Sequence, residues 1–219
     1  VDMKRTLLKG VCAAVIMTAG SISANAATVD PDAFAAGTVL DNAFAGVTLS
    51  IVGDGFGSAD GSSVIAIDPS AESAEPFSSS TGSLSFGHTS ANSFPHLFRE
   101  PGFKALRADF SGGASSVSID FISNDSADTG LLQAFSATDV LLGTYTTASL
   151  GFSAFETMTL SGIGNISYIL ASGDSGASSG GLDNLSFVSA AIPLPAAGWL
   201  LLGAVGGLGF AKRRKRRAS

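Results

Sequence analysis

The feature that most constrains the fold is a period-two alternation of apolar and polar residues along positions 27–190. Val47–Val52 and Val117–Ile122 are the clearest examples, and Gly/Ser-rich turn clusters separate such stretches at intervals of roughly ten residues. Further stretches of this kind are 84–86, 105–110, 131–135, 140–145, 156–160, 166–170 and 182–188. The pattern predicts an all-β domain over 27–190. We expect an antiparallel two-sheet sandwich of jelly-roll-like form, with about nine or ten strands.

The charge of this body is strongly negative. Residues 28–191 contain seventeen acidic and three basic residues, a net charge of −14, although the whole chain carries only −6. Such a body has little attraction for nucleic acid and suits divalent cations. The one cysteine, Cys12, precedes the body, which therefore has neither a disulfide nor thiol chemistry.

The first 26 residues have the three parts of a secretory signal peptide, in order. Met3-Lys4-Arg5 is positively charged, Val11–Ala19 is apolar, and Ala24 and Ala26 supply the small residues that signal peptidase requires. We expect cleavage after Ala26, so that the exported chain begins at Ala27. The apolar part is too short to span a membrane. Lipid attachment at Cys12 is disfavoured because the expected apolar residue three positions earlier is missing.

The C-terminal end, residues 191–219, predicts a membrane-spanning helix followed by a basic tail. Leu194–Ala211 is uncharged, and at ~1.5 Å per residue its eighteen residues match a bilayer core. Six consecutive bases follow at 212–217. The positive-inside rule keeps those bases in the cytoplasm and places the body outside. A nucleic-acid-binding patch is the alternative interpretation of the basic run, and its position directly after an apolar span disfavours it.

The segment before the span carries a sorting motif made of Ile192, Pro193, Leu194, Pro195 and Ala196. With the apolar span and the basic end, it resembles the VPLPA variant of the PEP-CTERM sorting tail, with Ile in place of Val. The resemblance covers residues 190–219. It implies recognition by an exosortase, a membrane-embedded protease, then removal of the tail and delivery from the inner membrane to the cell surface or extracellular matrix. It also implies a bacterium that makes exopolysaccharide.

The body offers no recognisable catalytic motif. His88 and His96 lack the spacing of a zinc or histidine-based site, and no serine nucleophile occurs in a strand-turn-helix context. Nothing selects a glycosidase pair among the carboxylates. We therefore expect a protein that is not an enzyme and requires no cofactor.

Calcium is the one metal that the sequence suggests. Asp183 opens the last alternating stretch, and residues 181–187 resemble the closing strand of exported jelly-roll modules, which often hold structural calcium nearby. Asp41 is the candidate second ligand. The loop 54–61 also offers oxygen ligands around glycines, but it lacks a closing bidentate Glu.

Two functions remain open for the body. The first is that of a structural protein of the cell surface or matrix, associated with exopolysaccharide. The alternative is a carbohydrate-binding module for that polysaccharide. The body contains no Trp, and only Tyr145 and Tyr168 could stack on sugar rings in the usual way, which weakens the second.

The proline pair distinguishes a sorting tag from a plain anchor. Proline holds Ile192–Pro195 extended, as a protease substrate requires, whereas alanine would continue the helix. We predict that Pro193→Ala with Pro195→Ala leaves a full-length membrane-held precursor, while the wild type is released about 25 residues shorter. Intact mass and fractionation measure this. Equal masses and equal fractionation of the two proteins would reduce the tail to an anchor.

Overall fold

The computed structural model describes residues 26–53, 61–73, 75–90, 94–99, 104–175 and 178–190, and these form antiparallel β structure. One 3-10 turn, η1 (Pro31–Ala33), follows the first strand. The strands are β1 (Ala26–Val29), β2 (Val47–Val52), β3 (Val64–Ile67), β4 (Ser85–His88), β5 (Phe98–Arg99), β6 (Ala105–Ser123), β7 (Gly130–Phe135), β8 (Leu141–Thr146), β9 (Phe155–Gly173) and β10 (Ser179–Ser189). The predicted all-β antiparallel fold is confirmed.

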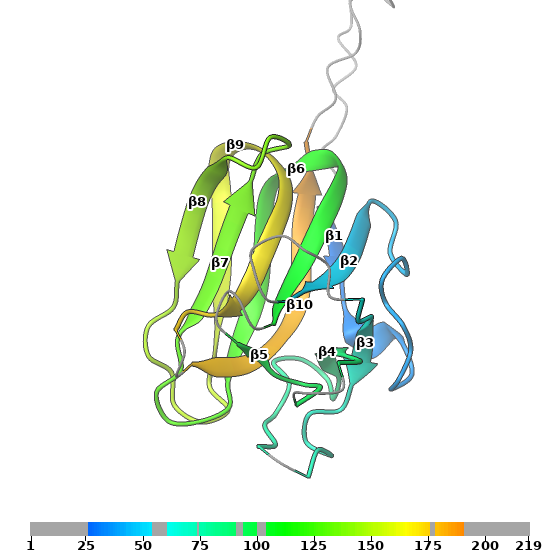
Figure 1. Cartoon of the computed structure of the whole chain (residues 1–219), viewed down its shortest axis with the longest axis vertical. Helices are drawn as coiled ribbons and strands as arrows, with labels where there is room; N and C mark the ends of the chain where they lie inside the picture. The colour runs from blue at the N-terminus through cyan, green and yellow to red at the C-terminus, as the bar shows by residue number, and fades with distance from the viewer. Residues whose placement is uncertain are drawn as a thin grey trace, which may run out of the picture.

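The two long strands, β6 and β9, pair with each other and run through both layers of the molecule (Figure 1). Layer A consists of β2, residues 105–110 of β6, residues 166–173 of β9, β7 and β8, in that order. Layer B consists of β3, β4, β10, residues 116–123 of β6 and residues 155–161 of β9; β1 and β5 also pair with β10. Because both long strands belong to both layers, the layers form one continuous sheet that folds over itself.

Glycines make the bend in each long strand. Gly112 and Gly113 in β6, and Gly162 and Gly164 in β9, all have positive φ, which glycine adopts without steric cost. The register between the two strands shifts at this point. The sequence predicted separate strands at 105–110 and 117–122, and again at 156–160 and 166–170. That part was wrong, because the glycines turn the chain without ending the strand.

The core lies between the layers and follows the predicted alternation. Layer A contributes Leu106 and Ala108 from β6, and layer B contributes Ile119 and Phe121 from the same strand; all four side chains are fully buried. Burial of apolar area of this kind is the main favourable contribution to folding.

Both ends of the described domain leave from the same place. Ala26 of β1 pairs with Val188 of β10, and the two strands meet at the end where the long strands bend (Figure 1). The described residues include no helix long and apolar enough to cross a membrane. The predicted span at 194–211 lies outside those residues, as does the leader up to residue 25.

Gly130 tests how closely the layers pack. A Cβ at Gly130 of β7 would overlap Cγ and Cβ of Phe121, which belongs to layer B and is fully buried. We predict that Gly130→Ala lowers the free energy of unfolding by about 1–3 kcal/mol through overpacking. Gly151→Ala is the control, since no atom lies within 4 Å of its Cβ. Denaturant unfolding of both variants measures the difference, and equal midpoints would contradict the close packing.

Candidate functional site

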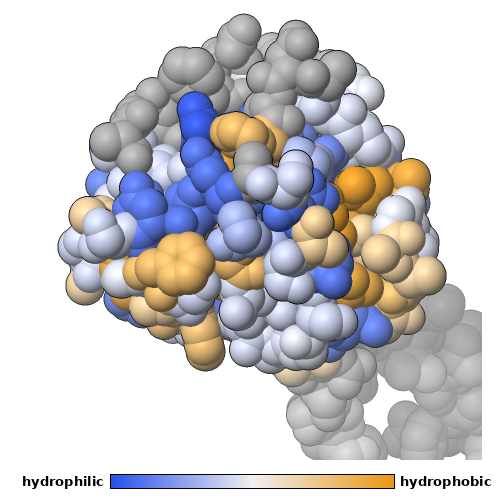
Figure 2. Space-filling model, turned by 90° about the horizontal axis from the view of Figure 1, so that it is seen from below, coloured by the Kyte–Doolittle hydropathy of each residue, from blue (hydrophilic) through white to orange (hydrophobic). Residues whose placement is uncertain are grey.

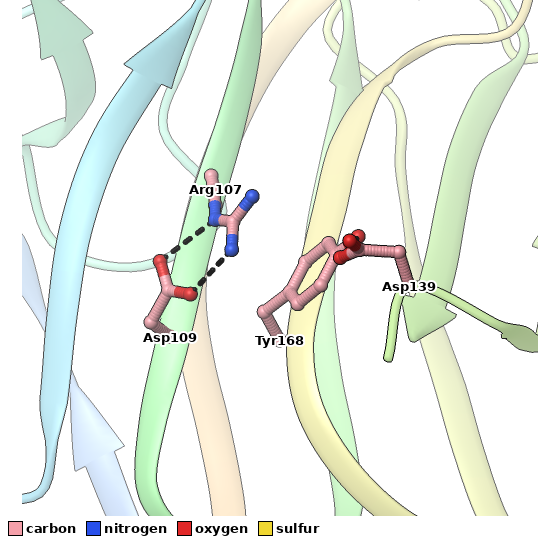
Figure 3. A network of polar contacts seen from close by, with 4 residues as sticks. All are labelled: Arg107, Asp109, Asp139 and Tyr168. Carbon is pink, nitrogen blue, oxygen red and sulfur yellow. Dashed lines mark hydrogen bonds and ion pairs between the residues drawn. The ribbon is translucent and has the colours of Figure 1, made fainter. Parts of the chain in front are cut away.

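The outer face of layer A carries a fixed guanidinium–carboxylate pair (Figure 3). Arg107 donates from Nε to Asp109 Oδ2 (2.8 Å) and from Nη2 to Asp109 Oδ1 (2.7 Å). The two residues lie two apart on β6 and so share one face of the strand. Their side chains are 22% and 42% exposed, so this rigid bidentate pair remains open to solvent.

Tyr168 holds the pair from the neighbouring strand. Arg107 Cζ lies 3.8 Å from the centroid of the Tyr168 ring, a cation–π contact. Phe135 of β7 stacks on the same ring, with centroids 4.8 Å apart and an interplanar angle of 8°. Because β9 lies between β6 and β7, the two neighbours approach the ring from opposite sides. We call Arg107, Asp109, Phe135, Asp139 and Tyr168 the Arg107 face.

The electrostatics of the Arg107 face keep its charges in place. The hydrogen bond to Asp109 raises the pKa of Arg107, so its cation persists at every physiological pH. Burial, followed by the hydrogen bond from its hydroxyl to Asp139 Oδ1 (3.0 Å), raises the pKa of Tyr168. Arg107 is the one basic residue between positions 105 and 190. The face therefore combines fixed donors with exposed carboxylate acceptors on an acidic body.

A second polar cluster lies on the outer face of layer B. Asp120 of β6 and Asp183 of β10 are cross-strand partners, and both are buried. A bulge after Asp183, with Asn184 at φ 51°, interrupts the register here. The two carboxylates are buried because residues 77–84 cross this face. Phe77 lies against Gly181, so closely that a Cβ at position 181 would overlap the Phe77 ring.

Ser80 joins the two buried carboxylates. Its Oγ lies 2.7 Å from Asp120 Oδ2 and 2.9 Å from Asp183 Oδ2, and Asp183 Oδ2 also accepts from the backbone N–H groups of Ser80 and Thr81 (both 3.1 Å). Thr157 donates to the other oxygen of Asp120. Burial raises the pKa of Asp183 to about 6, although these hydrogen bonds oppose the shift. Below about pH 6, a proton on Asp183 lets Ser80 Oγ accept from Asp183 while it donates its own proton to Asp120.

The structure assigns different partners to the two predicted calcium ligands. Asp183 Oδ1 accepts from Asn184 N (2.8 Å) and its Oδ2 from residues 80–81, while Asp41 Oδ1 accepts from Val64 N (2.7 Å). A cation would compete with these donors for the carboxylate oxygens. Within the described ranges, no group of three or more His, Cys, Asp or Glu is arranged to hold a metal ion. Calcium binding through Asp183 and Asp41 stays a prediction.

The predicted processing residues fall mostly outside the described residues. Ala24 and the sorting motif 192–196 lie there. Ala26 and Ala27 open β1 and pair with Val188 and Phe187 of β10. Cleavage after Ala26 would leave Ala27–Val29 still paired.

The loop end of the molecule, opposite the two termini, is mostly hydrophilic with separate apolar areas (Figure 2). Asp128, in the loop between β6 and β7, is 1% exposed. Its Oδ2 accepts from Ser123 Oγ and from the N–H groups of Asn124 and Asp125, and its Oδ1 accepts from Ser179 N (all 3.0 Å). Both oxygens are occupied, so Asp128 fixes the 123–128 loop to β10.

Comparison with known proteins gives no family. No family model and no curated protein matches the chain. Among solved structures, the K2 cleaved adhesin domain of Lys-gingipain matches with TM-score 0.46 and 14% identity over 74% of this chain and 99% of that one. A family 11 carbohydrate-binding module from Clostridium thermocellum matches with TM-score 0.32 and 14% identity over 65% and 96%. A family 32 module from C. perfringens in complex with galactose matches with TM-score 0.31 and 12% identity over 65% and 93%. All three TM-scores are below 0.5, so the role of this chain is argued from its own side chains.

Sequence reasoning missed the Arg107 face and the partners of Asp183. A signal for the first was present, because Arg107 and Asp109 share a face of a predicted strand and Arg107 is isolated among acids. No local pattern brings Ser80 to Asp120 and Asp183, which lie 40 and 103 residues away.

Asp183 predicts a dependence of stability on pH. Its pKa is about 6 in the folded protein against an ordinary value of 3.8. Between about pH 4 and pH 6, the folded state holds a proton that the unfolded chain has lost, so the free energy of unfolding falls as pH rises, by roughly 2–3 kcal/mol. We predict that Asp183→Asn removes this decline and that Asp174→Asn, an exposed control, retains it. Thermal unfolding at several pH values measures the effect, and parallel curves for all three proteins would contradict it.

Proposed function

We propose that this is an exported, non-catalytic protein of the cell surface or extracellular matrix, sorted by an exosortase-type system and associated with exopolysaccharide. The leader supports export, and the sorting motif supports recognition by an exosortase-type system. The pairing of β1 with β10 supports display of the domain at a surface, because both ends of the domain then leave from one side. A tail after residue 190 would therefore hold the sandwich by one end, with the loop end directed away.

The Arg107 face favours a second candidate, direct binding of the polysaccharide. Sugar hydroxyls both donate and accept, so a site for them needs fixed donors beside fixed acceptors. Arg107 and Asp109 supply both at a set spacing on an exposed strand face. This pre-organised pair is the observation that carries the candidate.

The same geometry specifies how a saccharide would bind. Both faces of the Tyr168 ring are occupied, one by Arg107 and one by Phe135. Stacking of a sugar on this ring is therefore unavailable, and recognition would depend on hydrogen bonds from Arg107 and to Asp109 and Asp139. A neutral saccharide suits the face better than a polyanion, because the body carries −14.

Affinity electrophoresis with the polysaccharide of the source bacterium tests this candidate. Charge-assisted hydrogen bonds contribute roughly 1.5–3 kcal/mol each, so we expect Arg107→Ala to weaken binding by about tenfold or more. Arg107→Lys should also weaken it, because lysine keeps the charge without the bidentate geometry. Arg99→Ala is the matched control, since it removes an exposed strand arginine elsewhere.

The outcomes separate the two candidates. Equal weakening by Arg107→Ala and Arg99→Ala would show that charge alone matters and would remove the Arg107 face as a site. If the wild type does not bind at all, the binding candidate fails, while the structural surface role stands. Unfolding midpoints of each variant establish that the proteins compared are folded.

A further inference from the structure

β8 is an edge strand that the described chain leaves uncovered. It ends layer A and, among the described strands, pairs with β7 alone. Thr147 N, just past its end, donates to Gly130 O (3.0 Å). Hydrogen-bonded positions alternate along an antiparallel pair, so Tyr145 and Gly143 also bond to β7. The N–H and C=O groups of Thr144 and Thr146 therefore point away from the sheet.

Three other outer strands are covered by a segment of the chain or carry a charged residue. β3 is covered by residues 37–40, through bonds such as Leu40 N to Val64 O (2.8 Å) and Gly37 N to Ala66 O (2.7 Å). Leu49 of β2 donates to Asp41 O (2.8 Å). Residues 155–161 of β9 carry Glu156, whose carboxylate accepts from Tyr145 and Ala148. Charged residues and covering segments are the usual means by which proteins protect edges.

The chain segment that contains β8 has exposed apolar residues and no charged residue of its own. No charged residue occurs from Val140 to Phe155, a stretch flanked by Asp139 and Glu156. Among the described residues, four of the six exposed large hydrophobics fall in it: Val140 (56%), Leu141 (49%), Phe152 (62%) and Phe155 (51%). The strand LLGTYT has neither Lys nor Pro. A bulge at its Leu141 end leaves residues 143–147 as the regular part.

We propose that β8 pairs with β8 of a second copy of this chain, antiparallel across a two-fold axis, to form a dimer with a sheet continuous through both layers A. Self-complementarity favours a second copy, because exposed apolar residues lie both at the start of β8 and in the segment that follows it, as a two-fold contact requires. The repulsion between two bodies of −14 is least where their chains meet through residues 140–155, which carry no charge. In an antiparallel pair, the Leu141 end of one strand lies beside the Thr146 end of the other. Tyr145 donates to Glu156 near that end, so Val140 and Leu141 would approach the region of Phe152 and Phe155 of the other copy.

The first test is the molar mass of the full chain in a mild detergent, measured by light scattering over a range of concentrations. The wild type should dimerise. Thr144→Lys with Thr146→Lys, both exposed, should raise the dissociation constant by about tenfold or more through facing like charges. Thr48→Lys is the matched control, an exposed threonine on β2 at the opposite edge of layer A, and should leave the dimer intact.

Cross-linking adds a readout that folding defects cannot imitate. Directly opposed residues in a hydrogen-bonded pair have Cα atoms about 5.5 Å apart, within the range of a disulfide. With Cys12→Ser in the background, Thr144→Cys plus Thr146→Cys should give a covalent dimer on oxidation, while Thr48→Cys plus Ser50→Cys should not. A wild type that stays monomeric would overturn the proposal. So would a dimer that persists in the lysine variant, or cross-linking equal to the β2 control.

Discussion

The pairing of β6 with β9 is the interaction on which the rest of the structure depends. These two strands supply the centre of both layers, and their shared bend at the four glycines lets one hydrogen-bonded ladder turn from layer A into layer B. Every other described strand except β3 and β8 pairs directly with β6, β9 or β10. Loss of the bend would separate the two apolar faces that form the core.

The ladder also determines where polar groups are held. On the outer face of layer A, period two places Arg107 and Asp109 together, and the β6–β9 register sets Tyr168 beside Asp109. On the outer face of layer B, the same strand places Asp120 beside Asp183, and residues 77–84 bury both. One carboxylate cluster is thus closed by the protein's own donors, whereas the Arg107 face is left open to solvent. This difference is the basis of our proposal that, if the domain binds polysaccharide directly, the Arg107 face makes the contact.

The sequence predicted the strands well because alternation is local, and Val47–Val52 and the stretch 182–188 both lie within strands as expected. The bend in β6 was missed because a Gly pair in a sequence normally indicates a turn. Only the structure shows that β9 bends beside it, so that the two strands stay paired. Ser80 was missed as well, because its role depends on a contact with Asp183 that only the folded chain creates. Short strands such as β5, with two residues, hold too few positions for any periodicity. Asp183 was singled out as a calcium ligand, which stays a prediction, and its partners in the fold could not be inferred from a local pattern.

Hydrogen exchange of the protein, with and without the polysaccharide that our proposal names as its ligand, tests the central claim most directly. The claim is that the Arg107 face makes the contact. Strand amides of residues 105–110 and 166–170 should exchange more slowly when the polysaccharide is present, while those of residues 116–123 in layer B should not change. Protection confined to the loop end, or no protection in β6 and β9 at saturating polysaccharide, would contradict the account.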